Sequence, residues 1–434
     1  MGPSENFDVV VVGGGSAGVA AAVSAAELGA HTLLLERGKS LGGNVAHAFV
    51  HTICGLYCAA SEGDARILNP GMPGRLAAGL CAAGVAGEAE RVGRVYVLPI
   101  EPPRYAAFLA ELCERTAGLE VRTESELIGV GRSDAIERRW ALRARDRAGD
   151  VRAVSTGWLV DTSGDANAAA LAGASLAAAD SEEIQLPSFI FRMSGVDRTE
   201  WVGFSKLHLT HAVAGAVRHG ELPAGCESVL VRPGLERDEV YVTLNLPRPI
   251  EAPYAPLDEA RLASLAAGAR DDAERIAEFL RRTRPAFEKS RVSGWPERIG
   301  VRETRRILGL RELRRDDVLS GRSDPAEIAR SSWPVELWHD HRRAHFEYPE
   351  GACSIPLGSL VSGSDPQLGM AGRCLSASHE ALGALRVIGT ALATGEAIGV
   401  AAALAANAGS PLDAIASGDV RHHILARADR EIAL

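Results

Sequence analysis

Near the amino terminus, short apolar runs alternate with a longer run of small apolar residues. Residues 8–12 are an aspartate followed by four valines, and residues 31–35 form a second short run that is mostly apolar. Between these runs, residues 19–28 are mainly small and apolar, and Gly29 follows them. Short apolar runs are typical of buried strands, and a longer run that ends at glycine is typical of a helix. The pattern therefore predicts strand, helix and strand in succession.

Similar patterns predict further elements. Helical spacing of large apolar residues occurs at 104–115 and 257–283, and patterns typical of strands occur at 119–130, 140–144, 151–160, 188–194 and 239–246. Residues 387–408 are weakly apolar, rich in Ala and Gly, and contain Glu396. This composition favours a buried helix over a membrane span. Residues 46–103 are rich in Gly, Ala and Pro, and we expect them to form loops.

A glycine-rich turn joins the first predicted strand to the first predicted helix. Residues 13–18 fit G-x-G-x-x-G, and an acid ends the second strand 18 residues after Gly18. Such glycines allow a tight turn, close approach of a pyrophosphate and packing of the helix on the sheet, while the acid accepts hydrogen bonds from ribose. The helix N-terminus favours phosphate. The pattern predicts a dinucleotide site that contains Gly13, Gly15, Ser16, Ala17, Gly18 and Glu36, extended by Arg37, Gly42, Gly43 and Asn44.

Further motifs indicate which dinucleotide is bound. A second glycine turn at 42–44 is followed by Asp-Thr-Ser-Gly-Asp-Ala-Asn at 161–167, by Arg-Glu-Thr-Arg-Arg-Ile-Leu-Gly at 302–309 and by the small-residue motif 371–383. In this order they resemble the motifs of FAD-dependent oxidoreductases, in a branch related to the flavoprotein subunits of fumarate reductase and succinate dehydrogenase. The resemblance implies FAD as cofactor, with Asp165 among the residues that bind it. One fold hosts many chemistries, so the substrate stays open.

The resemblance also implies a fold and its division into domains. It implies an α/β protein in which a Rossmann-like FAD-binding domain has a parallel sheet and an inserted α+β substrate domain has an antiparallel sheet. We expect the first part of the FAD-binding domain at 1–179, the substrate domain at 180–350 and the return of the FAD-binding domain at 351–434. The FAD-binding domain is then discontinuous in the sequence.

The resemblance places the carboxyl-terminal motif and the helix after it near the flavin. Gly372 and Arg373 would approach the FAD phosphates or the ribityl chain. In relatives, the N-terminus of the following helix points at the N1–C2=O edge of the flavin, which becomes negative on reduction, so the helix dipole stabilises the reduced form. Gly389 and Thr390 would provide the nearest backbone groups. The alternative is a small-residue helix that is buried by packing alone.

Cationic residues are the candidates for binding substrate. In fumarate-reductase-like relatives a His and an Arg of the carboxyl-terminal motif help to bind the substrate carboxylate. His379 and Arg386 resemble them in order, although the spacing differs. Arg302, together with Arg305, offers a second clamp because guanidinium groups bind carboxylates bidentately. The alternative for these two arginines is an ion pair with Glu303.

Residues 44–58 hold two histidines, two cysteines and one tyrosine directly after the second glycine turn. His47 or His51 could exchange a proton, because imidazole titrates near neutrality. One of them could instead carry a covalent flavin bond, as a nearby His does in some succinate dehydrogenase relatives. Cys54 and Cys58 could form a redox pair, although their spacing differs from that of disulfide reductases. The remaining interpretation is a packed helix with its thiols in the core.

These residues predict a FAD-dependent oxidoreductase of the dehydrogenase or oxidase type. It would move a hydride between a small, carboxylate-bearing organic substrate and flavin N5, with His51, His47 or His379 as the base and with oxygen or a carrier as electron acceptor. Two alternatives stay open: a thiol or disulfide reductase that uses Cys54 and Cys58, and a non-catalytic FAD-binding protein. The W-x-W-x-I-P and G-D-A-A-H signatures of flavin halogenases and aromatic hydroxylases are not met, which disfavours both classes.

Composition and charge limit the partners. The net charge of −9 and the pI of about 5.8 give no global attraction for nucleic acid. The first predicted strand starts within ten residues of Met1 without a basic leader, and the seven cysteines are an odd number, so we expect a cytoplasmic protein without a disulfide framework. The histidines at 339–345 lie among arginines in what we expect to be a surface loop, so no metal is expected. A homodimer is possible because dimers are the commonest oligomers.

Overall fold

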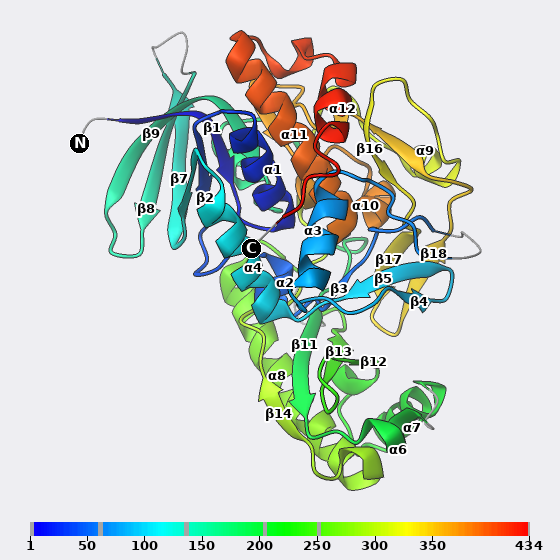
Figure 1. Cartoon of the computed structure of the whole chain (residues 1–434). Coiled ribbons are helices and arrows are strands. Elements are labelled where there is room, and N and C mark those ends of the chain that lie inside the picture. The colour runs from blue at the N-terminus through cyan, green and yellow to red at the C-terminus, as the bar shows by residue number, and fades with distance from the viewer. Residues whose placement is uncertain (1–3, 60–63, 134–138, 203–205, 250–252, 433–434) are drawn as a thin grey trace.

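A mostly parallel sheet occupies the centre of the larger of two lobes in the computed structural model, which describes residues 4–59, 64–133, 139–202, 206–249 and 253–432 (Figure 1). Parallel neighbours follow one another in the order β6 (Leu119–Arg122), β2 (Thr32–Leu35), β1 (Glu5–Val12), β9 (Val151–Asp161) and β20 (Leu368–Met370). An antiparallel meander continues from β9 through β8 (Trp140–Asp146) and β7 (Ser125–Arg132). The expected α/β fold with a Rossmann-like sheet is confirmed.

The four valines of β1 divide between two hydrophobic cores. Val9 and Val11 belong to the core that helices cover, whereas Val10 and Val12 belong to the core beneath the meander. A strand that is buried on both faces reads as a continuous apolar run rather than as an alternation. This position in the sheet explains the valine run at 9–12.

Two helices cross closely over the covered face of the sheet. They are α1 (Ser16–Glu27) and α11 (Ile388–Ala408), which lie side by side (Figure 1). A Cβ built at Gly395 would lie 2.1 Å from the Ala17 carbonyl oxygen, and one at Gly399 would lie 2.2 Å from the Ala21 carbonyl oxygen. Among the described residues, only α11 is long and apolar enough to cross a membrane, and 89% of its apolar window is buried inside the protein. The small residues of α11 thus serve helix packing.

The segment expected to be loops contains regular structure. After the short helix α2 (Asn44–Ala48), the chain forms the three-stranded sheet β3–β5–β4 and the helices α3 and α4, whose bounds are β3 (Thr52–Ile53), α3 (Met72–Ala82), β4 (Glu90–Val92), β5 (Val95–Pro99) and α4 (Pro102–Arg115). Helix α3 packs against α11, and the Met72 N–H donates to the Glu396 carboxylate at 2.6 Å. Tertiary contacts therefore order a segment whose local pattern is weak.

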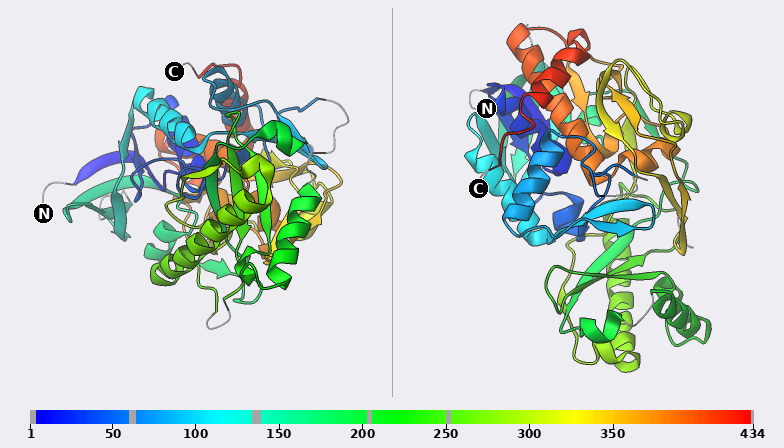
Figure 2. Two further views of the ribbon diagram at one scale, coloured as in Figure 1. Left: turned by 90° about the horizontal axis from the view of Figure 1, so that it is seen from below. Right: turned by 45° about the vertical axis from the view of Figure 1, so that its right-hand side comes forward.

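The smaller lobe has its own sheet and its own core. Its antiparallel strands follow the order β12 (Val229–Pro233), β13 (Val240–Asn245), β11 (Ser188–Ser194) and β14 (Arg291–Gly294). The long helix α8 (Glu259–Thr283) covers this sheet, and the smaller lobe projects from the larger one in Figure 1 and in the right-hand view of Figure 2. The separate core draws on residues 189–299, a narrower range than the expected 180–350. Helix α8 is amphipathic, which explains why its pattern predicts it well.

The rest of the expected substrate domain packs on the larger lobe. There β10 pairs with β15, β16 pairs with β19, and β17 forms a hairpin with β18. The remaining bounds are α5 (Asn167–Leu171), β10 (Leu176–Ala178), α6 (Arg198–Val202), α7 (Lys206–Arg218), β15 (Arg305–Ile307), α9 (Arg315–Leu319), β16 (Glu327–Ser331), β17 (Val335–Asp340), β18 (Arg343–Glu347), β19 (Cys353–Pro356), α10 (His379–Leu385) and α12 (Ser417–Leu425).

The close crossing of α1 and α11 gives a stability prediction. We expect Gly395→Ala to lower the melting temperature, because the added methyl carbon meets the Ala17 backbone and overpacking costs about 1–3 kcal/mol. The matched control is Gly268→Ala in α8, where a Cβ meets nothing within 4 Å and the change favours the helix by about 1 kcal/mol. Thermal unfolding followed by circular dichroism measures both. Equal melting temperatures for the two variants would contradict the packing argument.

Candidate functional site

The glycine motif forms the turn between β1 and α1. Gly13 has a φ of +103°, a conformation that side chains disfavour. A Cβ built at Gly18 would lie 1.8 Å from the Gly13 carbonyl oxygen. Thr162 Oγ1 lies 2.9 and 2.8 Å from the carbonyl oxygens of Val12 and Gly13, to which its hydroxyl donates. The turn is therefore fixed from the end of the neighbouring strand β9, and α1 begins directly against the sheet.

Glu36 lies at the end of β2, beside this turn. Its side chain is buried, Oε2 accepts a hydrogen bond from the Gly14 N–H at 2.7 Å, and Oε1 accepts one from the Gly38 N–H at 2.6 Å. An ionised carboxylate has roughly four acceptor positions. Glu36 thus holds the glycine turn and keeps acceptor capacity for ribose hydroxyls.

The second glycine turn lies against the first. The Gly42 N–H donates to the Gly14 carbonyl at 2.8 Å, and a Cβ built at Gly43 would lie 3.0 Å from the Gly15 Cα. No side-chain hydrogen bond caps the N-terminus of α1. The first N–H groups of a helix have no partner within the helix and favour an anion. A concave, glycine-lined backbone surface at a helix N-terminus fits the pyrophosphate of a dinucleotide.

Two other predicted cofactor residues tie this surface to its surroundings. Ser16 Oγ lies 2.9 Å from Tyr105 Oη, and burial raises the pKa of Tyr105 to about 12. Asn44 Nδ2 donates to the Val301 carbonyl at 3.1 Å. The first contact fixes the start of α1 to α4, and the second fixes the second glycine turn to the segment that carries Arg302.

Asp165 and Arg373, both predicted to bind cofactor, pair with each other. Arg373 Nη2 lies 2.7 Å from Asp165 Oδ1, and Arg37 Nη2 lies 3.8 Å from Asp165 Oδ2. Next to Arg373, a Cβ built at Gly372 would lie 3.0 Å from the Ala17 Cβ. Two residues from the distant motifs and one from the first motif therefore meet in one ion-pair cluster beside α1.

The N-terminus of α11 faces the chain after β3. The Gly389 N–H donates to the Cys54 carbonyl at 2.8 Å, and a Cβ built at Gly389 would lie 2.4 Å from the Gly55 carbonyl carbon. Thr390 Oγ1 lies 3.4 Å from Ser331 Oγ. Gly389 and Thr390, the two positions predicted to lie nearest the flavin, therefore both have hydrogen-bond partners within the protein. A role of these groups toward the flavin stays a prediction.

Arg302 lies partly buried between the lobes. Burial, together with the charge of Arg386, lowers the pKa of Arg302 to about 9. Its Nη2 donates to Asn245 Oδ1 at 2.6 Å, and its guanidinium carbon lies 4.5 Å from the ring centroid of Trp338. The structure thus brings the charges of Arg302 and Arg386, which are 84 positions apart in the sequence, into the same site.

One carboxylate, Glu336, faces these arginines. It accepts hydrogen bonds from the indole N–H groups of Trp333 at 3.0 Å and Trp338 at 2.6 Å, and lies 4.0 Å from Arg386 Nη2. Burial opposes its ionisation, but Arg386 and the two indoles outweigh burial and hold the pKa of Glu336 below its ordinary value. Glu336 is therefore ionised at neutral pH. Sequence reasoning missed this carboxylate.

His51 lies close to a third arginine. Its ring stacks on Tyr241 with centroids 4.5 Å apart, and Nδ1 lies 3.2 Å from the Phe49 carbonyl oxygen. Burial, strengthened by the charge of Arg232, lowers the pKa of His51 to about 3. A neutral imidazole that donates from Nδ1 presents a bare lone pair at Nε2. Arg232, on β12 of the smaller lobe, belongs to no sequence motif, so sequence reasoning could not find it.

Several buried polar atoms around these residues have no hydrogen-bond partner within the described part of the chain. They are His51 Nε2, both side-chain amide atoms of Gln185, Tyr254 Oη, Arg298 Nε and Arg386 Nε. Most buried polar groups in native proteins are paired with protein or with a bound molecule. Arg298 lies within electrostatic interaction of Glu36 at the cradle, and Tyr254 lies within electrostatic interaction of Arg302. Such unpaired atoms are compatible with a dinucleotide and a substrate that bind there.

The other two candidate histidines have partners at both ring nitrogens. His47 Nδ1 lies 2.8 Å from Glu297 Oε2, and its Nε2 lies 3.1 Å from the Ser40 carbonyl oxygen. Its ring also lies beside Gly38, at the Glu36 end of the site. His379 Nδ1 lies 2.8 Å from a carboxylate oxygen of Glu303. The structure thus spreads the three histidines over different parts of the site.

The two cysteines of residues 44–58 are separate, free thiols. Burial raises the pKa of Cys54 to about 11, and its sulfur lies 3.7 Å from Thr52 Oγ1. Cys58 instead lies close enough to Arg330 for their charges to interact. A redox-active thiol needs a lowered pKa. The environment of Cys54 has the opposite effect and does not favour the thiol or disulfide reductase.

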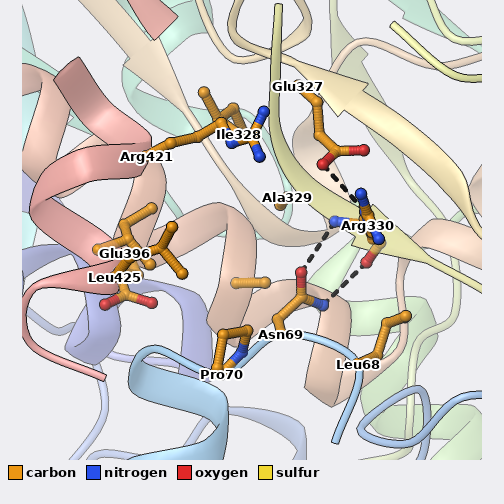
Figure 3. Close-up of a pocket in the computed structure, with 12 residues that line it drawn as sticks. Leu68, Asn69, Pro70, Glu327, Ile328, Ala329, Arg330, Glu396, Arg421 and Leu425 are labelled. Atoms are coloured by element: carbon orange, nitrogen blue, oxygen red, sulfur yellow. Dashed lines mark hydrogen bonds and ion pairs between the residues drawn. The ribbon is translucent and has the colours of Figure 1, made fainter. Parts of the chain in front are cut away.

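A cavity of about 250 Å³ lies away from this site, between α11, α12, β16 and the chain before α3 (Figure 3). Figure 3 shows Glu327 paired with Arg330 and Asn69 bonded to the Arg330 backbone on one side of it, and Glu396 on the other. Burial raises the pKa of Glu396 to about 7. Among the described residues, no group of three or more His, Cys, Asp or Glu side chains is placed to hold a metal ion.

The sheet, the glycine cradle and the acid at the end of β2 define a dinucleotide-binding protein of the Rossmann type. The sequence model described as "FAD dependent oxidoreductase" matches residues 8–424, so the chain belongs to this family of enzymes and its cofactor is FAD. The family model does not assign the chain to a finer branch of the family. No curated protein sequence matches the chain.

Solved structures that resemble the chain do so at low sequence identity. The p-nitrophenol 4-monooxygenase of Pseudomonas putida is 12% identical, with a TM-score of 0.46 over 99% of this chain and 91% of its own. A geranylgeranyl bacteriochlorophyll reductase-like protein of Thermoplasma acidophilum is 14% identical, with a TM-score of 0.47 over 99% and 93%. The anhydrotetracycline hydroxylase of Streptomyces rimosus is 14% identical, with a TM-score of 0.47 over 98% and 69%. These values support no conclusion about substrate.

Glu36 gives a prediction about cofactor affinity. We expect Glu36→Ala to weaken FAD binding about tenfold to hundredfold, because the Gly14 N–H loses its acceptor and the ribose loses a carboxylate. The control is Glu111→Ala on α4, whose carboxylate pairs with the exposed Arg115. Titration of the apoprotein with FAD, followed by flavin fluorescence, measures both. Unchanged affinity in Glu36→Ala would contradict the assigned cradle.

Glu396 gives a prediction about stability and pH. Its folded pKa of about 7 exceeds its ordinary value of 4.5, so its contribution to stability is fully present below pH 4.5 and is lost as the pH rises through 7, by about 3 kcal/mol in all. Glu396→Gln removes this ionisation and keeps an acceptor for Met72. We expect the stability of the variant relative to wild type to rise between about pH 5 and about pH 8 in urea unfolding. A difference that does not change with pH would contradict the raised pKa.

Proposed function

We propose that this enzyme transfers a hydride between a small, carboxylate-bearing organic substrate and FAD. The observation that carries the proposal is the gathering of Arg302, Arg386 and Arg232 around one partly buried site, where Glu336 is the carboxylate that faces them among the described residues. Excess buried positive charge is costly unless an anion is bound. Burial, and after it the charge of Arg386, lowers the pKa of Arg302, and a substrate carboxylate would act against both.

The geometry suggests different roles for the three arginines. The Arg302 guanidinium is held on Trp338 and by Asn245, so its orientation is fixed before a ligand arrives. Arg386 is partly neutralised by Glu336 and keeps an unpaired Nε. A guanidinium whose orientation is already fixed binds a carboxylate bidentately with little further loss of conformational entropy. Arg302 is therefore the main anchor, and Arg386 adds charge and a further donor.

His51 is the group best placed to accept a hydrogen bond from substrate. Its Nε2 is buried, unpaired and free of a proton when Nδ1 donates to the Phe49 carbonyl. A substrate carboxylate bound near Arg232 would offset the charge that lowers the pKa of His51 and make this nitrogen a better base. When bound, FAD supplies a hydride acceptor or donor at its N5 position.

The motifs support the same substrate class. Residues 161–167 and 371–383 resemble the branch related to fumarate reductase and succinate dehydrogenase, in which a His and an Arg help to bind a substrate carboxylate. Arg386 lies in the arginine cluster, whereas His379 pairs with Glu303. The resemblance therefore supports the anionic substrate through Arg386.

The proposal is tested by bleaching the flavin with a panel of candidate substrates. We expect hydroxy and amino acids, or unsaturated acids after chemical reduction of the flavin, to change its visible absorbance under anaerobic conditions. The matched amides of these compounds should have no effect. If the amides work as well as the acids, the carboxylate assignment is wrong.

Variants of Arg302 sharpen the test. We expect Arg302→Lys to weaken substrate binding about tenfold or more, because lysine keeps the charge but cannot bind a carboxylate bidentately. The control Arg145→Lys, on the exposed β8 surface where Arg145 pairs with Glu126, should bind as wild type does. Substrate titration of flavin absorbance measures both affinities. Equal affinities for wild type and Arg302→Lys would remove Arg302 from the site.

A further inference from the structure

The connection from β14 of the smaller lobe to β15 of the larger lobe runs along α2. Its Glu297 carboxylate lies 2.8 Å from His47 Nδ1, and the Arg298 N–H donates to the His47 carbonyl at 3.1 Å. Further along, the Val301 carbonyl accepts from Asn44 Nδ2 at 3.1 Å. Helix α2 begins directly after the second glycine turn. Contacts along α2 therefore fix this connection beside the glycine cradle.

The Arg298 side chain has an unused hydrogen-bond donor. The residue is partly buried, and its Nε is buried without a hydrogen-bond partner in the described part of the chain. The contacts of Glu297 and Val301 hold the connection on either side of it, so the guanidinium is not required to anchor the chain there. A buried guanidinium nitrogen without a partner in the protein is available to a bound molecule.

Other charged side chains gather around Arg298. It lies within electrostatic interaction of Glu36, Arg37, Asp165 and Arg373. Burial, followed by the charge of Arg37, lowers the pKa of Arg298, and the two carboxylates act in the opposite direction. Asp165 is already 2.7 Å from Arg373 and 3.8 Å from Arg37. Glu36 already accepts from two backbone N–H groups. Arg298 therefore adds a cation where the carboxylates are already engaged, and an anion would offset it.

Glu36 and Asp165 flank the first glycine turn. Glu36 Oε2 accepts from the Gly14 N–H at 2.7 Å. Asp165 closely follows Thr162, whose hydroxyl donates to the Gly13 carbonyl at 2.8 Å. An arginine within electrostatic interaction of both carboxylates lies close to the part of the cradle that they flank. This part is the turn at the N-terminus of α1, where a pyrophosphate fits.

We propose that Arg298 binds the pyrophosphate of FAD, together with the backbone N–H groups at the start of α1. A guanidinium group binds phosphate oxygens through paired N–H donors and keeps its positive charge. The glycine cradle offers backbone dipoles, which amount to a partial charge. Arg298 supplies the full counter-charge, and it comes from the connection to the smaller lobe rather than from a glycine motif. This role concerns the cofactor and does not depend on the proposed substrate.

The test starts from the holoenzyme and needs no substrate. A dilution series followed by flavin fluorescence, which rises when FAD leaves the protein, gives the dissociation constant of FAD. Competition by ADP and by adenosine in the same series gives theirs. We expect Arg298→Gln to raise the dissociation constants of FAD and ADP about tenfold or more, and to leave that of adenosine, which has no phosphate, unchanged. The matched control is Arg291→Gln, an exposed arginine on β14, which should leave all three unchanged.

A second variant separates the charge of Arg298 from its geometry. Lysine keeps the positive charge but cannot bind a phosphate bidentately. In Arg298→Lys we therefore expect dissociation constants of FAD and ADP between those of wild type and those of Arg298→Gln. Adenosine should again bind as it does to wild type.

Two results would overturn the role of Arg298. FAD and ADP could bind to Arg298→Gln as tightly as to wild type. Adenosine could instead lose as much affinity as ADP, which indicates that the substitution displaces the connection and removes no phosphate contact. If Arg298→Gln does not fold, the comparison of ADP with adenosine in Arg298→Lys decides by the same criteria. Failure of every carboxylate to bleach the flavin would contradict the proposed substrate and leave these dissociation constants unaffected.

Discussion

The contact between α1 and α11 is the constraint on which the site depends. Backbone meets backbone at this crossing, because Gly395 and Gly399 leave no space between α11 and the carbonyls of α1. The N-terminus of α1 forms the phosphate cradle, and the N-terminus of α11 meets the segment after β3. One rigid helix pair thus sets the spacing between the phosphate cradle and the segment after β3. Tightly packed interiors transmit displacements with little loss, so a shift of either helix moves both ends together.

Charge is distributed unevenly around this rigid frame. The cradle end contains acids and bases in near balance, with Asp165 between Arg373 and Arg37. The other end has three arginines and one facing carboxylate, and Arg232 comes from the smaller lobe. An anion bound there would attract charges on both lobes. Under the proposed function, ligand binding would therefore act on both lobes through one electrostatic interaction.

Local sequence patterns predicted the elements that neighbouring residues specify. They failed for elements that are held in place by residues distant in the sequence. The turn at Gly13 and the amphipathic helix α8 are each specified by residues within one continuous segment, and both occur as expected. Helix α3 has a weak pattern and is held by the Glu396 carboxylate, which is 324 positions away in the sequence. Motif order led to Arg302 and Arg386 as candidates. Arg232 could not be found, because only the fold brings β12 to residues 51–54.

The order of strands in the central sheet has a consequence for biosynthesis. Strand β1 comes first in the chain and β20 near its end, yet both flank β9, and α11 is made still later. A ribosome releases residues in order, so α1 leaves the exit tunnel long before the helix that covers it exists. The smaller lobe, with a core drawn from residues 189–299, is complete earlier. The nascent chain therefore holds an uncovered amino-terminal half, open to chaperones, until α11 emerges and the cofactor site closes.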